Sequence, residues 1–352
     1  MSLAFVSAEN LRCLEKAELE LHPAQNLISG ANGAGKTSIL EAIFMLGRGR
    51  SFRTRNTERL IRHGEEHLVV FGRTLGGIER TLGVRVARGA PTVAKIGGTQ
   101  AGTLAELAEI FPVQVIDPGV HKLLEESALR RRRWIDWAVF HVEPGFMETW
   151  VRYQRALQQR NAALRENPEQ AIAWELELSR SGEALAASRH RVLERLRPYW
   201  AETARGLIGR EVELQYIRGW PRDMSLADAL GASRSRDHLR GITHIGPHRA
   251  DVQIRIDARL ARLVVSRGQQ KLVAAALILA QLQMLREEFR SIPTLLLDDP
   301  AAELDRTHLT GFIDRVMNLK CQLVLTSLSL EPGLFGAPDR TFHVEQGRVR
   351  PV

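Results

Sequence analysis

Gly30-Ala31-Asn32-Gly33-Ala34-Gly35-Lys36-Thr37 is the stretch that decides the fold of this chain of 352 residues. An apolar run at 26–29 precedes it, and apolar residues at helical spacing follow it from Ile39 to Leu46. A strand, a glycine loop and a helix in this order are the context that a phosphate-binding loop requires. A glycine turn that merely caps a helix is the simpler alternative, but it leaves the strand before the loop unexplained.

The residue types of this loop suit a nucleotide. Glycines let backbone N–H groups turn inward around the β-phosphate, and the helix N-terminus adds partial positive charge. Lys36 would reach the β- and γ-phosphates, and the Thr37 hydroxyl would bind Mg²⁺. The predicted nucleotide-binding residues are Gly30, Ala31, Asn32, Gly33, Ala34, Gly35, Lys36, Thr37 and Ser38.

An acidic pair, Asp298-Asp299, ends the apolar run 295–297 much later in the chain. It should emerge at the carboxyl end of a central strand, where α/β sheets bind ligands. We predict Thr37 and Asp298 as the metal ligands, and Asp299 and Lys36 as catalytic residues, with Asp299 orienting the attacking water. An isolated Asp-Asp after a strand is usually only a turn, so the prediction depends on the phosphate loop.

Just before this acidic pair lies a serine-glycine-glutamine motif, Ser266-Arg267-Gly268-Gln269-Gln270-Lys271. Taken alone, Ser266 and Gln269 fit a capping box at a helix N-terminus. The chain order also favours an approach of Ser266, Gly268 and Gln269 to the ATP of a second copy of the protein. The cap and the role in trans are compatible, and together they predict an ATP-dependent homodimer.

Arginines follow the phosphate-loop helix closely, and the formal net charge of +8 favours a polyanionic partner. We consider Arg48, Arg50, Arg53 and Arg55 as candidates for contact with DNA phosphates, with a solvated face as the equal alternative. The same alternative applies to the run 130–133. Trp134 and Trp137 after that run are expected to pack into a core.

Other features of the sequence narrow the class of protein. The longest late apolar run, 272–280, is shorter than the roughly 20 residues that cross a bilayer, and the first ten residues do not resemble an export signal, so we expect a cytoplasmic protein without a membrane span. Cys13 and Cys321 are expected to be buried small hydrophobes. His244 and His248 cross a Gly-Pro break, which disfavours a zinc pair and favours a structured loop facing nucleotide or DNA.

The expected fold is α/β: a P-loop ATPase head whose helical second lobe bears a short antiparallel helical hairpin. We expect an ATP-binding lobe at 1–120, a helical lobe with the hairpin and the serine-glycine-glutamine motif at 121–289, and the rest of the ATPase core at 290–352. Apolar stripes predict the hairpin within 145–206, with a break at Asn167-Pro168. Strands are predicted at 3–6, 17–21, 26–29, 68–73, 81–85, 92–96, 251–256, 294–297 and 322–325, with a last pair at 340–350. Further helices are predicted from Lys36 to Gly47 or Gly49, at 104–110 and at 270–285.

In combination, these motifs resemble the RecF family, bacterial recombination mediators within the SMC-like ATPases. The resemblance runs nearly end to end. The segments that carry it are 30–40, 47–53, 140–146, 246–251, 266–271 and 303–305.

The resemblance implies an ATP-binding-cassette head that dimerises with ATP and Mg²⁺ and hydrolyses ATP slowly, stimulated by DNA. It implies binding to double-stranded, single-stranded and gapped junction DNA, where the family works with RecR and RecO to load RecA in replication restart and the SOS response. By position, Arg12 resembles an early arginine near the nucleotide phosphates, Asn32 the loop asparagine near the γ-phosphate, and Thr326 the switch residue. Segment 303–305 resembles one that crosses the dimer interface.

This chain also departs from the family pattern. Pro300-Ala301-Ala302 replaces a stretch that often carries a serine, so a hydroxyl contact across the dimer is missing. Glu125-Glu126-Ser127-Ala128 stands where a glycine-rich turn is common. Gln114 is only a candidate for a nucleotide-sensing glutamine.

Two other functions compete with a DNA-dependent ATPase switch. One is a DNA scaffold that binds ATP without hydrolysing it. The other is the ATPase subunit of a membrane transporter, which the helical hairpin disfavours.

Overall fold

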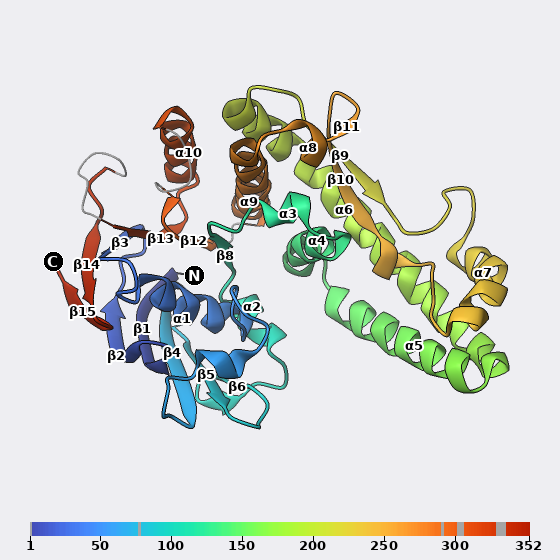
Figure 1. Ribbon diagram of the computed structural model, residues 1–352, viewed down its shortest axis with the longest axis horizontal. Helices are drawn as coiled ribbons and strands as arrows, with labels where there is room; N and C mark the ends of the chain where they lie inside the picture. Colours follow the sequence, from blue (N-terminus) through green and yellow to red (C-terminus); the bar gives the residue numbers. More distant parts are fainter. Residues whose placement is uncertain (1, 77–78, 290–291, 301–305, 329–335) are drawn as a thin grey trace. The chain divides into compact units, whose positions relative to one another are not determined.

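The computed structural model describes residues 2–76, 79–289, 292–300, 306–328 and 336–352. These residues form two compact units (Figure 1). Met1–Val120 and Leu285–Val352 make up the first unit, and His121–Met284 the second. The C-terminal segment therefore shares a unit with the phosphate loop, although the second unit separates them in sequence.

A six-stranded sheet, ordered β15-β14-β3-β13-β12-β8, carries the loop in the first unit. Both β3 and β12 are parallel to β13 between them. Every residue of β3 and β12 is buried, as is typical of parallel strands covered on both faces. Because the three strands run the same way, the ends of β3 and β12 meet at one edge of the sheet. The bounds are Gln25–Ser29 (β3), Val113–Ile116 (β8), Thr294–Leu297 (β12), Gln322–Ser327 (β13), Arg340–Glu345 (β14) and Arg348–Pro351 (β15).

The second sheet of this unit is antiparallel, ordered β2-β1-β4-β5-β6-β7. Buried and exposed residues alternate along β4 and β5, so one face of the sheet packs inward. A short 3-10 helix, η1 (Thr57–Leu60), lies beside β5. The strands are Ser2–Leu11 (β1), Leu14–Glu20 (β2), His67–Leu75 (β4), Thr81–Ala87 (β5), Val93–Ile96 (β6) and Thr99–Gln100 (β7).

Helix α1 (Lys36–Arg48) contacts strands of both sheets, and its apolar residues form one core with them. Each fully buried Leu or Ile of this kind stabilises the fold by about 1.5–3 kcal/mol. Position 47, inside the helix, has room only for glycine, because a Cβ there would lie 2.4 Å from the Phe111 carbonyl oxygen. The helix ends at Arg48, and the next residue, Gly49, caps it with the left-handed φ of 61°. Helices α2 (Ala105–Ile110) and α10 (Arg306–Asn318) complete the unit.

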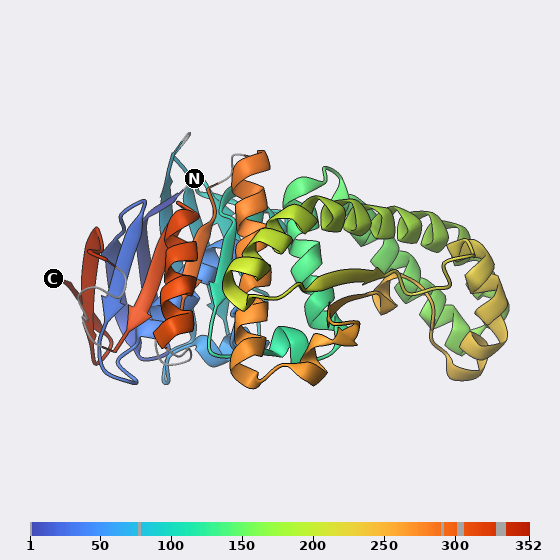
Figure 2. The same cartoon turned by 90° about the horizontal axis from the view of Figure 1, so that it is seen from above.

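A helical hairpin forms one part of the second unit, and Figure 2 shows its helices side by side. Helix α5 (Phe146–Glu166) ends before Pro168, a 3-10 turn η2 (Pro168–Trp174) reverses the chain, and α6 (Glu175–Ile208) returns. The predicted stripe residues Tyr153 and Leu157 are buried. Helix α7 (Leu226–Arg240) packs on both hairpin helices. The predicted hairpin and its break are confirmed.

The rest of the second unit surrounds a small antiparallel sheet, ordered β11-β10-β9. Helix α4 packs on β10, and Trp134 and Trp137 of α4 are buried as predicted. The elements are α3 (Lys122–Glu125), α4 (Ala128–Val142), β9 (Glu213–Ile217), η3 (Pro247–Arg249), β10 (Asp251–Ile256), β11 (Arg259–Leu260), α8 (Ala261–Val264) and α9 (Arg267–Phe289). The last residues of α9, from Leu285, belong to the first unit.

Some predictions about single elements were wrong. Helix α9 begins at Arg267, not Gln270, because its capping box lies earlier in the sequence. Helix α1 continues through Gly47, for the packing reason given above, and ends before Gly49, the other predicted end, which is confirmed. Cys13 is exposed because it lies in the tight turn between β1 and β2, whereas Cys321 is buried as predicted. Burial raises the pKa of the Cys321 thiol to about 12.

Candidate functional site

The phosphate loop joins the end of β3 to the start of α1 with backbone angles that favour glycine. Gly30, Gly33 and Gly35 have φ values of 154°, 78° and 119°. A Cβ on Gly30 would lie 2.3 Å from the Val344 carbonyl oxygen, so no other residue fits there. Ala31, Asn32 and Gly33 form the exposed tip, while Ala34 and Ser38 are buried.

Lys36 is buried under this loop. Its Nζ donates to the carbonyl oxygens of Gly30 at 2.6 Å and Ala31 at 3.0 Å. Burial lowers the pKa of Lys36, and the carboxylates of Asp299 and Asp298 oppose that shift. The ammonium group therefore lies inside the loop, where a phosphate would be surrounded by the loop's N–H groups.

Thr37, Asp298 and Thr326 meet at the sheet edge where β3, β12 and β13 end. The Thr37 hydroxyl lies 3.0 Å from Oδ1 and 3.1 Å from Oδ2 of Asp298. The Thr326 hydroxyl donates to Asp298 Oδ1 at 3.0 Å. A hydroxyl and a carboxylate side by side are oxygen ligands of the kind that Mg²⁺ takes beside substrate phosphates, so these residues fit the metal. The sequence motifs that were predicted separately are thus brought together.

Asp299 follows with an unusual backbone, since its φ is 48° and it is not glycine. The Thr326 hydroxyl accepts a hydrogen bond from the Asp299 amide at 2.9 Å, which holds this turn. Burial raises the pKa of Asp299, the Lys36 ammonium opposes the rise, and Asp298 adds to it. A carboxylate with a raised pKa at a strand end is suited to accept a proton from water.

Arg12 is held by Glu41, a residue that the sequence analysis missed. Arg12 Nε and Nη2 donate to the Glu41 carboxylate at 2.5 and 3.0 Å. Ser51 donates to the same carboxylate at 2.5 Å, and the Glu41 side chain is fully buried. A glutamate in an apolar helical stripe, three residues from Ser38, is the only sequence signal for it. Glu41 thereby ties the Arg12 turn to the start of the arginine-rich segment.

The arginines of that segment differ in their surroundings. Arg48 is half-buried: its Nε donates to the Val113 carbonyl at 3.4 Å, and its guanidinium lies 5.6 Å from the centre of the Phe44 ring. Burial and the charge of Arg50 lower the pKa of Arg48. Arg50, Arg53 and Arg55 are exposed, and Arg53 lies 3.8 Å from Glu41. Contact of these residues with DNA stays a prediction.

In the second unit, the serine-glycine-glutamine motif begins α9 as an exposed capping box. The Ser266 amide donates to Gln269 Oε1 at 3.0 Å, and the Gln269 amide donates to Ser266 Oγ at 3.3 Å. This confirms the predicted cap. A Cβ on Gly268 would meet no atom within 4 Å. Ser266, Gly268 and Gln269 are therefore accessible at a helix N-terminus, and their role in trans stays a prediction.

The arginine run 130–133 divides between the surface and the protein: Arg130 and Arg133 are exposed, as a solvated face predicts, whereas Arg131 and Arg132 are half-buried. Arg131 donates to the Asp251 carboxylate at 2.7 and 3.1 Å and to carbonyls that end α3. Arg132 donates to the Ala250 carbonyl at 2.7 Å. The guanidinium groups of Arg131 and Arg132 point inward because they donate to backbone oxygens that have no partner within their own helix.

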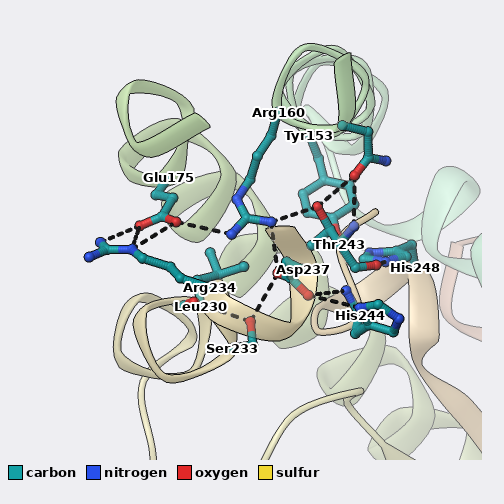
Figure 3. A network of polar contacts seen from close by, with 11 residues as sticks. Tyr153, Arg160, Glu175, Leu230, Ser233, Arg234, Asp237, Thr243, His244 and His248 are labelled. Carbon is teal, nitrogen blue, oxygen red and sulfur yellow. Dashed lines mark hydrogen bonds and ion pairs between the residues drawn. The ribbon is translucent and has the colours of Figure 1, made fainter. Parts of the chain in front are cut away.

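His244 and His248 join a buried polar network in the second unit (Figure 3). The fully buried Arg160 donates to Asp237 at 2.9 Å and to Glu175 at 3.0 Å. His244 Nδ1 lies 2.9 Å from Asp237 Oδ1. His248 lies between the Tyr153 hydroxyl, at 2.6 Å, and the Thr243 carbonyl, at 3.0 Å. The histidine loop therefore joins helices of the second unit as a structured loop, and its facing nucleotide or DNA stays a prediction.

The departures from the family pattern have local explanations where the structure describes them. Glu126 and Ser127 link α3 to α4 with negative φ, so no glycine is needed there. Gln114 is buried in β8, beside Leu295 of β12. Ala301, Ala302 and residues 303–305 lie outside the described residues.

Comparisons with known proteins identify the family. A model of the RecF/RecN/SMC N terminal domain matches residues 2–348. The DNA replication and repair protein RecF of Pseudomonas paraeruginosa is 39% identical over 361 residues, which cover 99% of this chain and 97% of the relative. The chain belongs to the RecF family. RecF of Pseudomonas syringae pv. tomato is likewise 39% identical over 359 residues, 99% of this chain and 98% of the relative.

Solved structures agree with this membership of the RecF family. A structure of the recombination mediator protein RecF with ATP in the RecFOR pathway has a TM-score of 0.90, with 26% identity, 100% coverage of this chain and 97% of the other. An Smc head bound to the C-terminal winged helix of ScpA has a TM-score of 0.59 at 17% identity and supports the fold alone. The predicted fold, an SMC-like ABC ATPase head with a helical lobe, is confirmed. None of the described helices is long and apolar enough to cross a membrane.

Proposed function

We propose that this chain is an ATP-dependent DNA-binding protein of recombinational gap repair. One observation supports this most: Thr37 and Thr326 both reach the Asp298 carboxylate at the mouth of a glycine loop that holds Lys36. The RecF relatives are described as DNA replication and repair proteins, and one solved RecF was studied with ATP in the RecFOR pathway.

ATP would bind at the phosphate loop, with residues 30–38 around its phosphates. The loop N–H groups and the Lys36 ammonium would hold the β- and γ-phosphates, and Arg12, fixed by Glu41, would add positive charge beside them. Thr37 and Asp298 would hold Mg²⁺, which supplies neutralisation of charge on the transferring phosphoryl group. Asp299, with its raised pKa, would orient the attacking water and accept its proton. Thr326 would act as the switch residue: because it hydrogen-bonds both Asp298 and the Asp299 amide, a change at the nucleotide would change its position at the end of β13.

Hydrolysis in this scheme is slow and stimulated by DNA, and it needs a second copy of the chain. The exposed Ser266, Gly268 and Gln269 would close over the ATP of the partner copy. The dimer would grip double-stranded, single-stranded or gapped DNA, with Arg50, Arg53 and Arg55 as candidate contacts. RecR would bind it, with RecO and RecA acting downstream in gap repair, replication restart and the SOS response in the cytoplasm.

The test is DNA binding with and without ATP across a salt series, on gapped, duplex and single-stranded substrates. For the Arg50→Ala/Arg55→Ala double variant, we expect the salt slope on duplex to fall by about 2 compared with the unmodified chain, because two phosphate contacts are lost. The matched control, Arg85→Ala, changes an exposed arginine of β5 and should leave the slope unchanged. Lys36→Met should abolish the effect of ATP, while Lys95→Met, on an exposed lysine, should not. Equal DNA affinity with and without ATP would contradict the proposal.

A scaffold that binds ATP without hydrolysing it is the alternative, and Asp299 separates the two functions. Asp299→Asn keeps the size of the side chain but removes the proton acceptor. If hydrolysis times DNA release, the variant should bind ATP and DNA normally and release DNA at least tenfold more slowly in ATP. Release rates identical to those of the unmodified chain would favour the scaffold.

A further inference from the structure

The second unit contains a groove that the proposed function does not use. It runs between α6 and β9, has a volume of about 1250 Å³, and we call it the β9 groove. Figure 1 shows β9 and β10 running along α6. Its walls include Ala186, Ala187 and His190 of α6, Leu214 and Tyr216 of β9, and Trp220.

The strand that borders the groove is the edge of its sheet. Among the described strands, β9 pairs only with β10, so one side of it carries no ladder. Alternate residues of such a strand direct N–H and C=O groups away from the sheet, where another strand can add. With five residues at about 3.3 Å each, β9 offers an edge of roughly 17 Å.

The groove has room beside this edge because α6 presents small side chains there. Ala186 and Ala187 are alanines on the side of the hairpin helix that faces the groove, and Ala187 is exposed. Tyr216 and His190 stack at 6.4 Å between ring centres. The groove can therefore accommodate every second side chain of an extended segment that lies along β9. When a strand adds to a sheet edge, such side-chain contacts provide the specificity.

Unused hydrogen-bond donors and unpaired charge gather at one end of the groove. Trp220 is 8% exposed, and its Nε1, like Nε of Arg218, has no acceptor among the described residues. The Arg218 guanidinium lies 4.6 Å from the centre of the Trp220 ring and donates to carbonyl oxygens only. Neither Arg218 nor Arg222 forms an ion pair with any described carboxylate. Carboxylates of a ligand would satisfy this end.

Two carboxylates also line the groove, beside four arginines. Glu213 lies across the strand pair from Arg255, and Glu183 accepts a hydrogen bond from the Leu226 amide at 2.8 Å. The surplus charge of the groove is therefore positive and lies at the Trp220 end.

A peptide fits these features better than a nucleic acid strand. Single strands bind by stacking bases on accessible aromatic faces, whereas Trp220 is buried and covered by Arg218. Glu183 and Glu213 on the walls would also repel a continuous phosphate backbone. We propose that the β9 groove binds a short, extended, acidic segment of a partner protein, which adds as a strand to the free edge of β9.

Selection from a displayed library of random decapeptides on the full chain, without nucleotide, tests this proposal. We expect enrichment of peptides that combine alternating apolar residues with Asp or Glu near one end. Ala187→Trp fills the groove from an exposed position, and Arg222→Glu reverses the unpaired charge. Both should weaken binding of a selected, fluorescein-labelled peptide at least tenfold, whereas Arg236→Glu, on an exposed arginine of α7, should have no effect.

Hydrogen exchange then identifies the binding mode, with expected slowing of amides in 213–217 when the peptide is bound. Three results would overturn the proposal: no enrichment over bare matrix, peptide binding that Ala187→Trp leaves unchanged, or binding without slowed exchange in β9. If labelled oligo-dT binds the unmodified chain and Arg236→Glu but not Ala187→Trp or Arg222→Glu, the groove binds nucleic acid instead. ATP binding by Ala187→Trp serves as the check that the first unit is intact and keeps this test separate from the proposed ATP-dependent function.

Discussion

Glu41 shows how much a single buried carboxylate fixes around the candidate nucleotide site. Its two oxygens accept hydrogen bonds from Arg12 and Ser51, and Ser51 in turn accepts from the amides of Arg53 and Thr54. Arg12 has a left-handed φ of 54°, which this pairing helps to hold. The position of Arg12 and the start of the arginine-rich segment therefore depend on the same side chain.

Replacing Glu41 by Ala should destabilise the first unit by about 2–4 kcal/mol. Removal of one partner from a buried pair typically costs about 3–5 kcal/mol, and Arg12, with 27% of its side chain exposed, recovers part of its hydration. Urea unfolding measures the loss. Glu79→Ala breaks an exposed pair with Arg73 and should cost less than about 1 kcal/mol. Equal losses for the two variants would show that Glu41 has no special role.

Single residues were predictable where a motif ties residue type to chemistry. The loop and Asp298 were found from their sequence context and Thr326 from the family resemblance, and the structure brings them to one strand end. Glu41 was missed because its partners, Arg12 and Ser51, lie in a turn and a loop whose positions depend on the packing of both sheets. A glutamate on an apolar helix face indicates a buried ion pair or hydrogen bond, but the sequence does not show which residue is its partner.

At the scale of elements, the hairpin and the loop 243–248 are joined by polar groups rather than by apolar packing alone. Burial by itself would raise the pKa of Asp237, but hydrogen bonds from His244 and Arg160 outweigh it and lower that pKa. Burial lowers the pKa of His248 to about 4. His248, which lies against Tyr153 of α5, is therefore neutral at neutral pH.

The second unit should lose stability in mild acid because of His248. Its pKa is about 4 when folded and 6.5 in a model peptide, so the unfolded chain binds the extra proton first and stability falls as pH drops below 6.5. Between pH 7.5 and pH 5 this amounts to about 2 kcal/mol. Urea unfolding at the two pH values should show a smaller acid loss for His248→Gln. His190→Gln, on an exposed histidine of α6, should keep the full loss.

Elements were predictable where periodicity or a break is local. Asn167-Pro168 marked the hairpin turn, and the apolar runs marked β3 and β12. Gly47 could not be interpreted correctly, because its role inside α1 comes from the close approach of the Phe111 carbonyl, a contact between distant segments. The surroundings of Arg131 and Arg132 could not be predicted for the same reason: their partners are backbone oxygens and Asp251, which only the folded unit brings near.

At the scale of the whole molecule, the phosphate loop and Asp298 belong to one unit even though 261 residues separate Thr37 from Asp298. Parallel pairing of β3, β13 and β12 accounts for their meeting. Ser266, Gly268 and Gln269 at the start of α9 are exposed and therefore accessible to another molecule. If this motif acts on the ATP of another copy, the ATPase site is complete only in a dimer.

Complementation between two defective variants tests that requirement. Lys36→Met should lose ATP binding but keep the motif, whereas Gly268→Arg should bind ATP but block closure, since the space around Gly268 is open and the capping box stays intact. We expect neither variant alone to dimerise with ATP in light scattering.

An equimolar mixture should form dimers, because the ATP of the Gly268→Arg copy can be closed by the motif of the Lys36→Met copy. Gly231→Arg, on a glycine of α7 with equally open space, is the matched control and should dimerise alone. A mixture that stays monomeric, or a Gly268→Arg protein that dimerises by itself, would mean that this motif does not act across two copies.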